Sequence, residues 1–156
     1  MALYCLDTSV FINGWTKNYP PDVFQGVWDA IDRLIDTNCV SCPREVLEEI
    51  RKKTDELCVW AEARECVFFE HSEAVQRACR FILANPSYRG LVNAKKGRSM
   101  GDPWVIAHAQ VHGATVVAEE INSRSNKKPK IPDVCRALHI PCIRTVDLLK
   151  NIGFRA

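Results

Sequence analysis

Short apolar runs alternate with amphipathic stretches along the chain, and the two patterns predict different elements. Apolar runs with little internal alternation are typical of strands buried on both faces of a parallel sheet. Five such runs predict strands at residues 4–6, 39–42, 67–69, 114–118 and 141–144. Helical periodicity or helix-start signals predict helices at residues 9–15, 22–35, 44–52, 56–64, 72–83, 102–112, 132–138 and 145–153. This alternation indicates an α/β fold, with a parallel β-sheet of about five strands flanked by helices.

Start signals indicate where several of these helices should begin. Asp22 with Gln25 three positions later is a capping-box pattern, so Asp22 is expected to open its helix. Pro43 is expected at a first helical position, and so is Pro103, which would place Asp102 at an N-cap. No repeat, linker or low-complexity tract interrupts the pattern. The 156 residues are therefore expected to form a single domain, residues 1–156, with a core of its own.

Composition narrows the class of protein without identifying it. Hydrophobic and charged fractions of 47% and 26% are ordinary for a folded soluble protein. The net charge of +2 is too small to indicate nucleic-acid binding, so only a local basic cluster could do so. The first residues lack the pattern of a signal peptide, and no apolar run is long enough to cross a bilayer. We therefore expect a cytoplasmic protein with reduced cysteines and no membrane partner.

The eight cysteines need an explanation of their own. Most stand in apolar surroundings, where a free cysteine packs as a small hydrophobic residue. Cys39 and Cys42 have the spacing of zinc ligands, but a closed structural site needs four ligands and no second pair follows. Packing is therefore the favoured interpretation of the cysteines.

Candidate chemistry begins with the acid that follows the first predicted strand. In open parallel sheets, ligands bind outside the carboxyl ends of the strands, which is where Asp7 is expected. Two hydroxyl residues, Thr8 and Ser9, come next, so this turn could hold a hard metal ion or a phosphate. Asp7 fits a purely structural role equally well, as the N-cap of the following helix.

The helix after the second strand carries three glutamates, and their helical phase separates them. At about 100° per residue, Glu49 lies roughly 105–110° from the centre of the apolar stripe, at the border between core and solvent. Glu45 and Glu48 lie roughly 150° from that centre and are expected on a solvated face. Glu49 is therefore the acid expected to reach a cleft beside the sheet.

Further polar residues are expected near the same edge. Asp102 stands at a helix start, where free N–H groups and the helix dipole favour an anion, although capping alone would explain it too. Glu119, Glu120 and Asn122 follow the fourth strand, at the carboxyl edge that Asp7 shares. Carboxylates brought together need cations, and oxygen ligands suit Mg²⁺ or Mn²⁺. Such a site suits metal-assisted hydrolysis of a phosphodiester bond.

Basic residues flank these acids on both sides. They are Lys95, Lys96 and Arg98 before Asp102, and Arg124, Lys127, Lys128 and Lys130 after Glu120. An RNA phosphate backbone could bind across the acidic site through them, since lysine and arginine neutralise phosphates. Solubilising charge on a loop explains each single residue at least as well.

Four segments together resemble the signature blocks of the PIN-domain family, in that family's order. They are Leu6–Ile12, Pro43–Ile50, Gly101–Ala107 and Thr115–Glu120. The resemblance covers essentially the whole chain. It is closest to a PIN-like bacterial and archaeal subfamily known mainly as a domain of unknown function.

The resemblance implies a three-layer PIN-like fold and a metal-dependent endoribonuclease that uses Mg²⁺ or Mn²⁺ to hydrolyse RNA. Proteins of this kind are often the toxin of a VapC-type toxin–antitoxin pair, which implies an antitoxin partner and a possible homodimer. The family's metal-binding and catalytic roles fall on Asp7, Glu49 and Asp102. The hydroxyl of Thr8 or Ser9 would support the site.

The fourth acid departs from the family pattern. The family usually has Asp within Thr-x-Asp after the fourth strand, whereas this chain has Ala118-Glu119-Glu120. Glu120 matches that Asp by position, with a longer side chain and without the Thr. The resemblance therefore places the fourth catalytic and metal-binding role on Glu120 by position, with Glu119 as the alternative for that role. Glu119 and Asn122 are otherwise expected in supporting roles.

Other enzyme classes fit the motifs less well. Haloacid-dehalogenase-type phosphatases need a second Asp two residues after the first, where this chain has Ser9. Receiver domains need paired acids ahead of the strand that carries the phosphorylated Asp, and Asp7 comes too early. His108 and His112 have the spacing of zinc-protease ligands without the glutamate between them. The main alternative is a catalytically weakened PIN scaffold that binds RNA or a protein partner.

Overall fold

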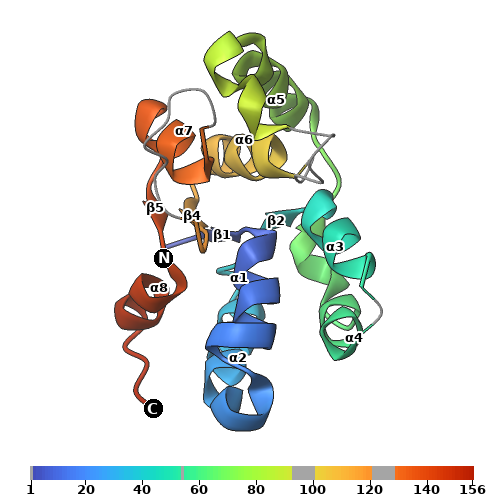
Figure 1. Cartoon of the computed structure of the whole chain (residues 1–156), viewed down its shortest axis with the longest axis vertical. Coiled ribbons are helices and arrows are strands. Elements are labelled where there is room, and N and C mark those ends of the chain that lie inside the picture. Colours follow the sequence, from blue (N-terminus) through green and yellow to red (C-terminus); the bar gives the residue numbers. More distant parts are fainter. Residues whose placement is uncertain (1, 54, 93–100, 121–128) are drawn as a thin grey trace.

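Five short parallel strands form the centre of the molecule in the computed structural model, which describes residues 2–53, 55–92, 101–120 and 129–156 (Figure 1). They are β1 (Tyr4–Leu6), β2 (Cys42–Pro43), β3 (Phe68–Phe69), β4 (Thr115–Val117) and β5 (Cys142–Ile143). β1 pairs with β4 and β4 with β5, while β2 pairs with β3, all in parallel. The α/β class and the five parallel strands agree with the prediction.

The two strand groups are joined through the first residue of β1. Tyr4 N donates a 2.8 Å hydrogen bond to the Cys39 carbonyl, and Ser41 N donates a 3.0 Å bond to the Tyr4 carbonyl. A parallel bridge between Tyr4 and Val40 completes this junction. The spatial order is therefore β3-β2-β1-β4-β5, with the ladder reduced to a single bridge between β2 and β1.

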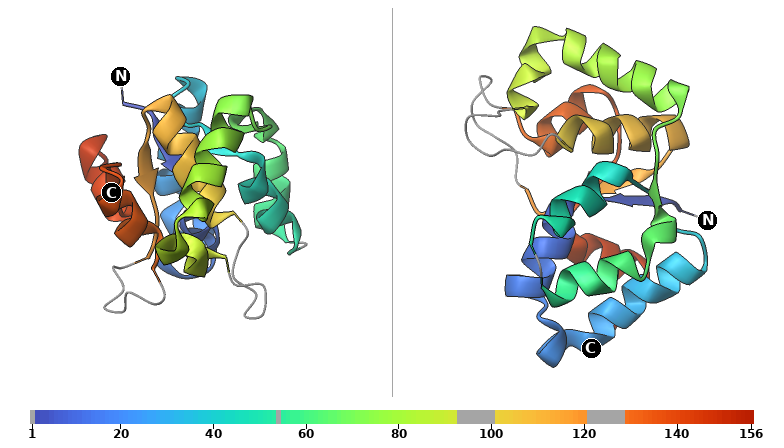
Figure 2. Two further views of the ribbon diagram at one scale, coloured as in Figure 1. Left: turned by 90° about the horizontal axis from the view of Figure 1, so that it is seen from above. Right: turned by 90° about the vertical axis from the view of Figure 1, so that its right-hand side faces the viewer.

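Helices cover both faces of these strands, which gives the three layers that the family resemblance implied (Figure 2). On one side lie α5 (Glu73–Ala84), α6 (Asp102–His112) and α7 (Ile131–Ala137). On the other side lie α1 (Thr8–Asn13), α2 (Pro21–Asp36), α3 (Arg44–Arg51), α4 (Glu56–Glu62) and α8 (Thr145–Asn151). Short π- and 3₁₀-helical segments occupy Gly14–Asn18, Glu65–Val67 and Pro86–Leu91.

Three expected helix starts are wrong by one or two residues. α2 begins at Pro21 with Pro20 as its N-cap, so Asp22 lies inside the first turn and not at the cap. Pro43 is the N-cap of α3, and Asp102 is the first residue of α6 after the N-cap Gly101. The fixed φ of proline suits the first turn of a helix, so neighbouring positions compete for the start and the local sequence does not decide between them.

The core is continuous and includes most of the cysteines. Cys5, Cys42, Cys79 and Cys135 are fully or almost fully buried, and none of the eight cysteines forms a disulfide. The Sγ of Cys39 contacts Thr37, and among the described residues neither Cys39 nor Cys42 belongs to a metal-binding group. No helix among the described residues is long and apolar enough to span a membrane.

Candidate functional site

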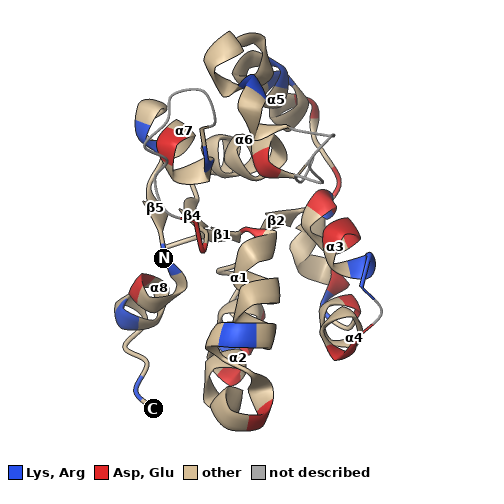
Figure 3. Ribbon diagram, viewed as in Figure 1, with Lys and Arg blue, Asp and Glu red and all other residues tan. Residues whose placement is uncertain are grey.

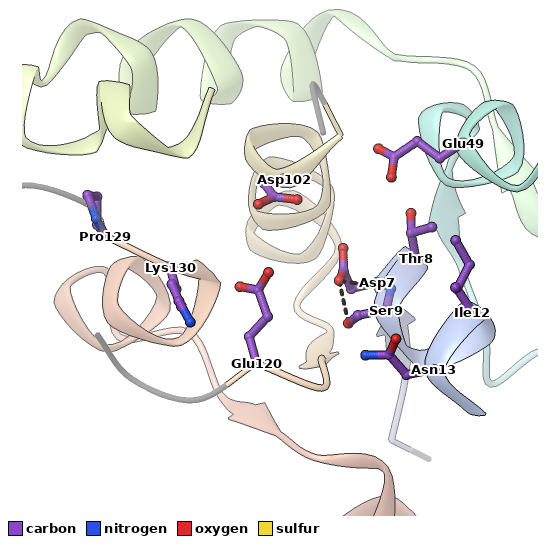
Figure 4. Close-up of a pocket in the computed structure, with 10 residues that line it drawn as sticks. All are labelled: Asp7, Thr8, Ser9, Ile12, Asn13, Glu49, Asp102, Glu120, Pro129 and Lys130. Atoms are coloured by element: carbon purple, nitrogen blue, oxygen red, sulfur yellow. Dashed lines mark hydrogen bonds between the residues drawn. The ribbon is translucent and has the colours of Figure 1, made fainter. Parts of the chain in front are cut away.

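The ends of β1 and β4 bring two acidic segments together. Leu6 pairs with Val117 in the parallel register, and Asp7 N donates a 2.9 Å hydrogen bond to the Val117 carbonyl. Asp7 and Glu120 therefore leave the sheet at the same edge. A pocket of about 210 Å³ opens there (Figure 4). Its lining residues are Asp7, Thr8, Ser9, Ile12, Asn13, Glu49, Asp102, Glu120, Pro129 and Lys130.

Asp7 is buried and held in place by the turn that follows it. It is the N-cap of α1 and is only 4% exposed. Its Oδ2 accepts a 2.6 Å hydrogen bond from Ser9 Oγ and a 3.1 Å bond from Ser9 N. Ser9 Oγ in turn accepts a 2.9 Å bond from Glu119 N. The Ser9 hydroxyl thus connects the end of β1 to the end of β4. The Asp7 carboxylate both caps α1 and lines the pocket.

The pKa of Asp7 is raised from 3.8 to about 6, mainly because burial disfavours the charged form. The hydrogen bonds from Ser9 lower the pKa, whereas the nearby carboxylates of Glu120 and Glu49 raise it further. The pocket therefore carries an excess of negative charge that a cation would relieve. Perturbation by burial together with charged neighbours is typical of functional sites.

α3 presents Glu49 to the pocket, as its helical phase predicted. Figure 4 shows its side chain across the pocket from Asp102 and above Thr8. Glu48 is exposed and forms ion pairs with Arg44 and Arg51. The expectation that Glu45 also faces solvent is wrong, because its half-buried carboxylate accepts a hydrogen bond from His71. Helical phase alone cannot reveal a partner 26 positions away.

Glu119 and Glu120 have separate tasks although they are adjacent. The Glu119 side chain is only 6% exposed and accepts a 2.9 Å hydrogen bond from Thr145 N and a 3.3 Å bond from Arg144. It therefore fixes the start of α8 and does not line the pocket. Glu120 does line it, and its Oε2 accepts a 3.3 Å hydrogen bond from Ile131 N.

The sequence comparison identifies the family. Residues 4–156 match the family described as "Domain of unknown function (DUF4411)". The chain belongs to this family. No curated protein sequence matches it.

Solved structures show the same fold. One is a chain of the crystal structure of VapBC2 from Rickettsia felis bound to a DNA fragment from their promoter, with a TM-score of 0.55 and 14% identity over 91% of this chain and 98% of that one. Another is a chain of FitAcB from Neisseria gonorrhoeae, with a TM-score of 0.56 and 14% identity over 92% and 99% of the two chains. The DUF4411 chain therefore has the PIN-like fold that its four segments predicted.

The chemistry of the pocket in this DUF4411 protein fits a hard divalent cation. Every acid in it offers carboxylate oxygens, which Mg²⁺ and Mn²⁺ prefer. Thr8 Oγ1 is buried and has no hydrogen-bond partner among the described residues. As they stand, no three His, Cys, Asp or Glu side chains of the described ranges are close enough to hold a metal ion. A cation would therefore have to draw the carboxylates together.

Seven of the predicted site residues lie outside the described residues. They are Asn122, Lys95, Lys96, Arg98, Arg124, Lys127 and Lys128. Lys130 does line the pocket, beside Pro129 (Figure 4). Asn13 also lines it and was missed by the sequence analysis. Its position four residues after Ser9, on the same face of α1, was the signal that could have pointed to it.

Proposed function

We propose that this protein is a divalent-metal-dependent endoribonuclease whose site is the carboxylate pocket. The observation that carries the proposal is the meeting of Asp7, Glu49, Asp102 and Glu120, from four separate segments, around one pocket at the carboxyl edge of the strands. Figure 3 shows the corresponding acidic ribbon segments at the start of α6, in α3 and after β4. The PIN-like fold supports this proposal by analogy.

In this proposal Asp7, Glu49, Asp102 and Glu120 would hold Mg²⁺ or Mn²⁺, and the bound ion would supply an activated water and stabilise the leaving oxygen of the phosphodiester. The chain's own residues prepare the site. Ser9 orients the Asp7 carboxylate through its 2.6 Å hydrogen bond and keeps that oxygen from turning away. Thr8 Oγ1 offers a further oxygen at the same place.

Lysine and arginine residues would bring the RNA to this pocket. Lys130 lines the pocket, which supports a role for it in binding a phosphate. We assign the same task to Lys95, Lys96, Arg98, Arg124, Lys127 and Lys128, and a supporting role to Asn122. Phosphate contacts of this kind position the substrate without reading its sequence.

We also infer a toxin role in the cytoplasm, with an antitoxin protein as partner. The R. felis structure contains VapBC2 on promoter DNA, and the N. gonorrhoeae structure contains FitAcB. A chain of the same fold could be inhibited by a partner that covers the carboxylate pocket. Homodimerisation is part of the same proposal.

The test is cleavage of labelled single-stranded RNA by the purified protein with Mn²⁺, with Mg²⁺ and with a chelator. The wild type should cut only with metal, and Asp7→Asn should cut at less than about 1% of its rate, because a catalytic metal ligand has been lost. Glu73→Gln, which changes an exposed acid that does not line the pocket, is the matched control. Equal cutting by Asp7→Asn and the wild type would remove the proposed site.

A second candidate function is a PIN scaffold that binds RNA or protein with weakened catalysis. It is favoured by Glu120, which stands where the PIN-domain family usually has Asp. The Glu120 carboxylate also accepts a 3.3 Å hydrogen bond from Ile131 N. Mn²⁺ affinity separates the two candidates. A nuclease should bind Mn²⁺ through Asp7 and Asp102, whereas a pure binding module need not.

A further inference from the structure

Three side chains link the helix of Glu49 to the helix of Asp102. His71 Nε2 is hydrogen-bonded to the Glu45 carboxylate on α3. The same imidazole stacks on Trp104 of α6, with ring centroids 3.6 Å apart and an interplanar angle of 13°. His71 lies between β3 and α5 and so belongs to neither helix. It connects them from the side, through one polar and one aromatic contact.

The positions of the contacts matter as much as their geometry. Glu45 is one helical turn before Glu49 on α3, and Trp104 is two residues after Asp102 in the first turn of α6. Each helix contributes one acid to the pocket, Glu49 from α3 and Asp102 from the first turn of α6. His71 therefore contacts both helices within one turn of the residues that line the pocket.

The linkage is poorly arranged for stability alone. The side chains of His71 and Glu45 are only 14% and 27% exposed. His71 Nδ1 and Glu45 Oε2 are buried and have no hydrogen-bond partner among the described residues. A buried polar atom without a protein partner reduces the net stability that a contact contributes, so each one calls for an explanation. Holding two helices at a fixed separation is one such explanation.

We propose that Glu45, His71 and Trp104 are positioning residues that fix α3 against the first turn of α6 and so set the separation of Glu49 and Asp102. The effect of this fixed separation on metal binding rests on the proposed function. Residues that orient metal ligands from behind commonly change metal affinity 10- to 100-fold when mutated. None of the three residues lines the pocket itself.

The experiment compares the wild type, His71→Ala, His71→Gln and the control Glu48→Gln. His71→Ala removes both contacts, whereas His71→Gln keeps a donor for Glu45 and a planar group against Trp104. Amide hydrogen exchange in the metal-free proteins reports whether α3 and the first turn of α6 are held. Mn²⁺ titration, followed by water-proton relaxation, reports whether the pocket acids are positioned.

We expect faster exchange over residues 44–51 and 101–105 in His71→Ala, and Mn²⁺ affinity about 10-fold below that of the wild type. His71→Gln should lie between the two, and Glu48→Gln should match the wild type. Unchanged exchange in His71→Ala, or faster exchange with wild-type Mn²⁺ affinity, would overturn the proposal. If His71→Ala does not fold, His71→Gln decides by the same two readouts.

Failure of the proposed function would look different. In that case the wild type itself would bind no Mn²⁺ and cut no RNA. The exchange measurement needs neither metal nor RNA, so it would still support or overturn the fixing of α3 against α6.

Discussion

Ser9 Oγ lies 2.6 Å from the Asp7 carboxylate and donates a hydrogen bond to it. The same oxygen accepts a hydrogen bond from Glu119 N at the end of β4. Replacing this hydroxyl should therefore affect both strand ends. It should also remove an interaction that lowers the pKa of Asp7.

Ser9→Ala is expected to lower the free energy of unfolding by about 1–3 kcal/mol, because it leaves the buried Glu119 N–H and Asp7 carboxylate with fewer partners. Urea unfolding at pH 7 measures this cost. The Asp7 pKa should rise above about 6, which NMR titration of the carboxyl carbon would follow. Ser87→Ala is the matched control, because among the described residues Ser87 forms a hydrogen bond to Asn85 through its backbone N–H and none through its hydroxyl. Identical behaviour of the two variants would contradict the role of Ser9.

Asp7→Asn should make the metal-free protein more stable at neutral pH. The folded pKa of about 6 lies above the unfolded value of 3.8, so the stability contributed by protonated Asp7 is lost as pH rises from about 4 through 6. The variant should therefore gain up to about 3 kcal/mol over the wild type between pH 4 and pH 7. Urea unfolding at several pH values tests this. A pH-independent difference between the two proteins would show that Asp7 is not perturbed.

Glu49→Gln and Glu48→Gln form a matched pair on one helix. Glu49 lines the pocket, whereas Glu48 is exposed and pairs with Arg44 and Arg51. We expect Glu49→Gln to reduce RNA cleavage at least 100-fold and Glu48→Gln to change it less than about 2-fold. Single-turnover cleavage with Mn²⁺ compares them. The reverse order would mean that Glu49 is not a ligand.

Glu120→Gln and Glu119→Gln should separate activity from stability. Glu120 lines the pocket, so its variant should lose most cleavage and Mn²⁺ affinity with little change in melting temperature. Glu119 holds Thr145 N and Arg144 instead, so its variant should lose about 1–2 kcal/mol of stability while retaining activity. Thermal melts and cleavage assays on both proteins decide. If Glu119→Gln were inactive but as stable as the wild type, Glu119 and not Glu120 would be the acid needed for activity.

Mn²⁺ should raise the melting temperature of the wild type. At a concentration 100 times its Kd, a ligand of the folded state adds about 2.7 kcal/mol, which corresponds to roughly 5–10 °C for a chain of this size. Asp7→Asn and Asp102→Asn should show little of this increase, whereas Glu48→Gln should show all of it. Calorimetry with and without chelator measures the shift. Equal shifts in all four proteins would place the metal elsewhere.

The amino-acid sequence by itself determined the class of the fold and the list of candidate acids. Alternating strand and helix signals depend on neighbouring residues, so they indicate five parallel strands without tertiary information. Parallel strands share a carboxyl edge, which is why Asp7 and Glu120 could be expected together. Helical phase was enough to select Glu49 over Glu48, because side-chain direction on a helix follows from spacing alone.

Only the tertiary structure decided how these acids divide their tasks. Glu119 turns toward Thr145 and Glu120 toward the pocket, although both follow the same strand. Glu45 meets His71, a partner from a distant segment that no local pattern reveals. The pKa of Asp7 depends on burial and on carboxylates contributed by other elements. These properties arise from packing between segments far apart in the chain, whereas periodicity describes only what each segment does alone.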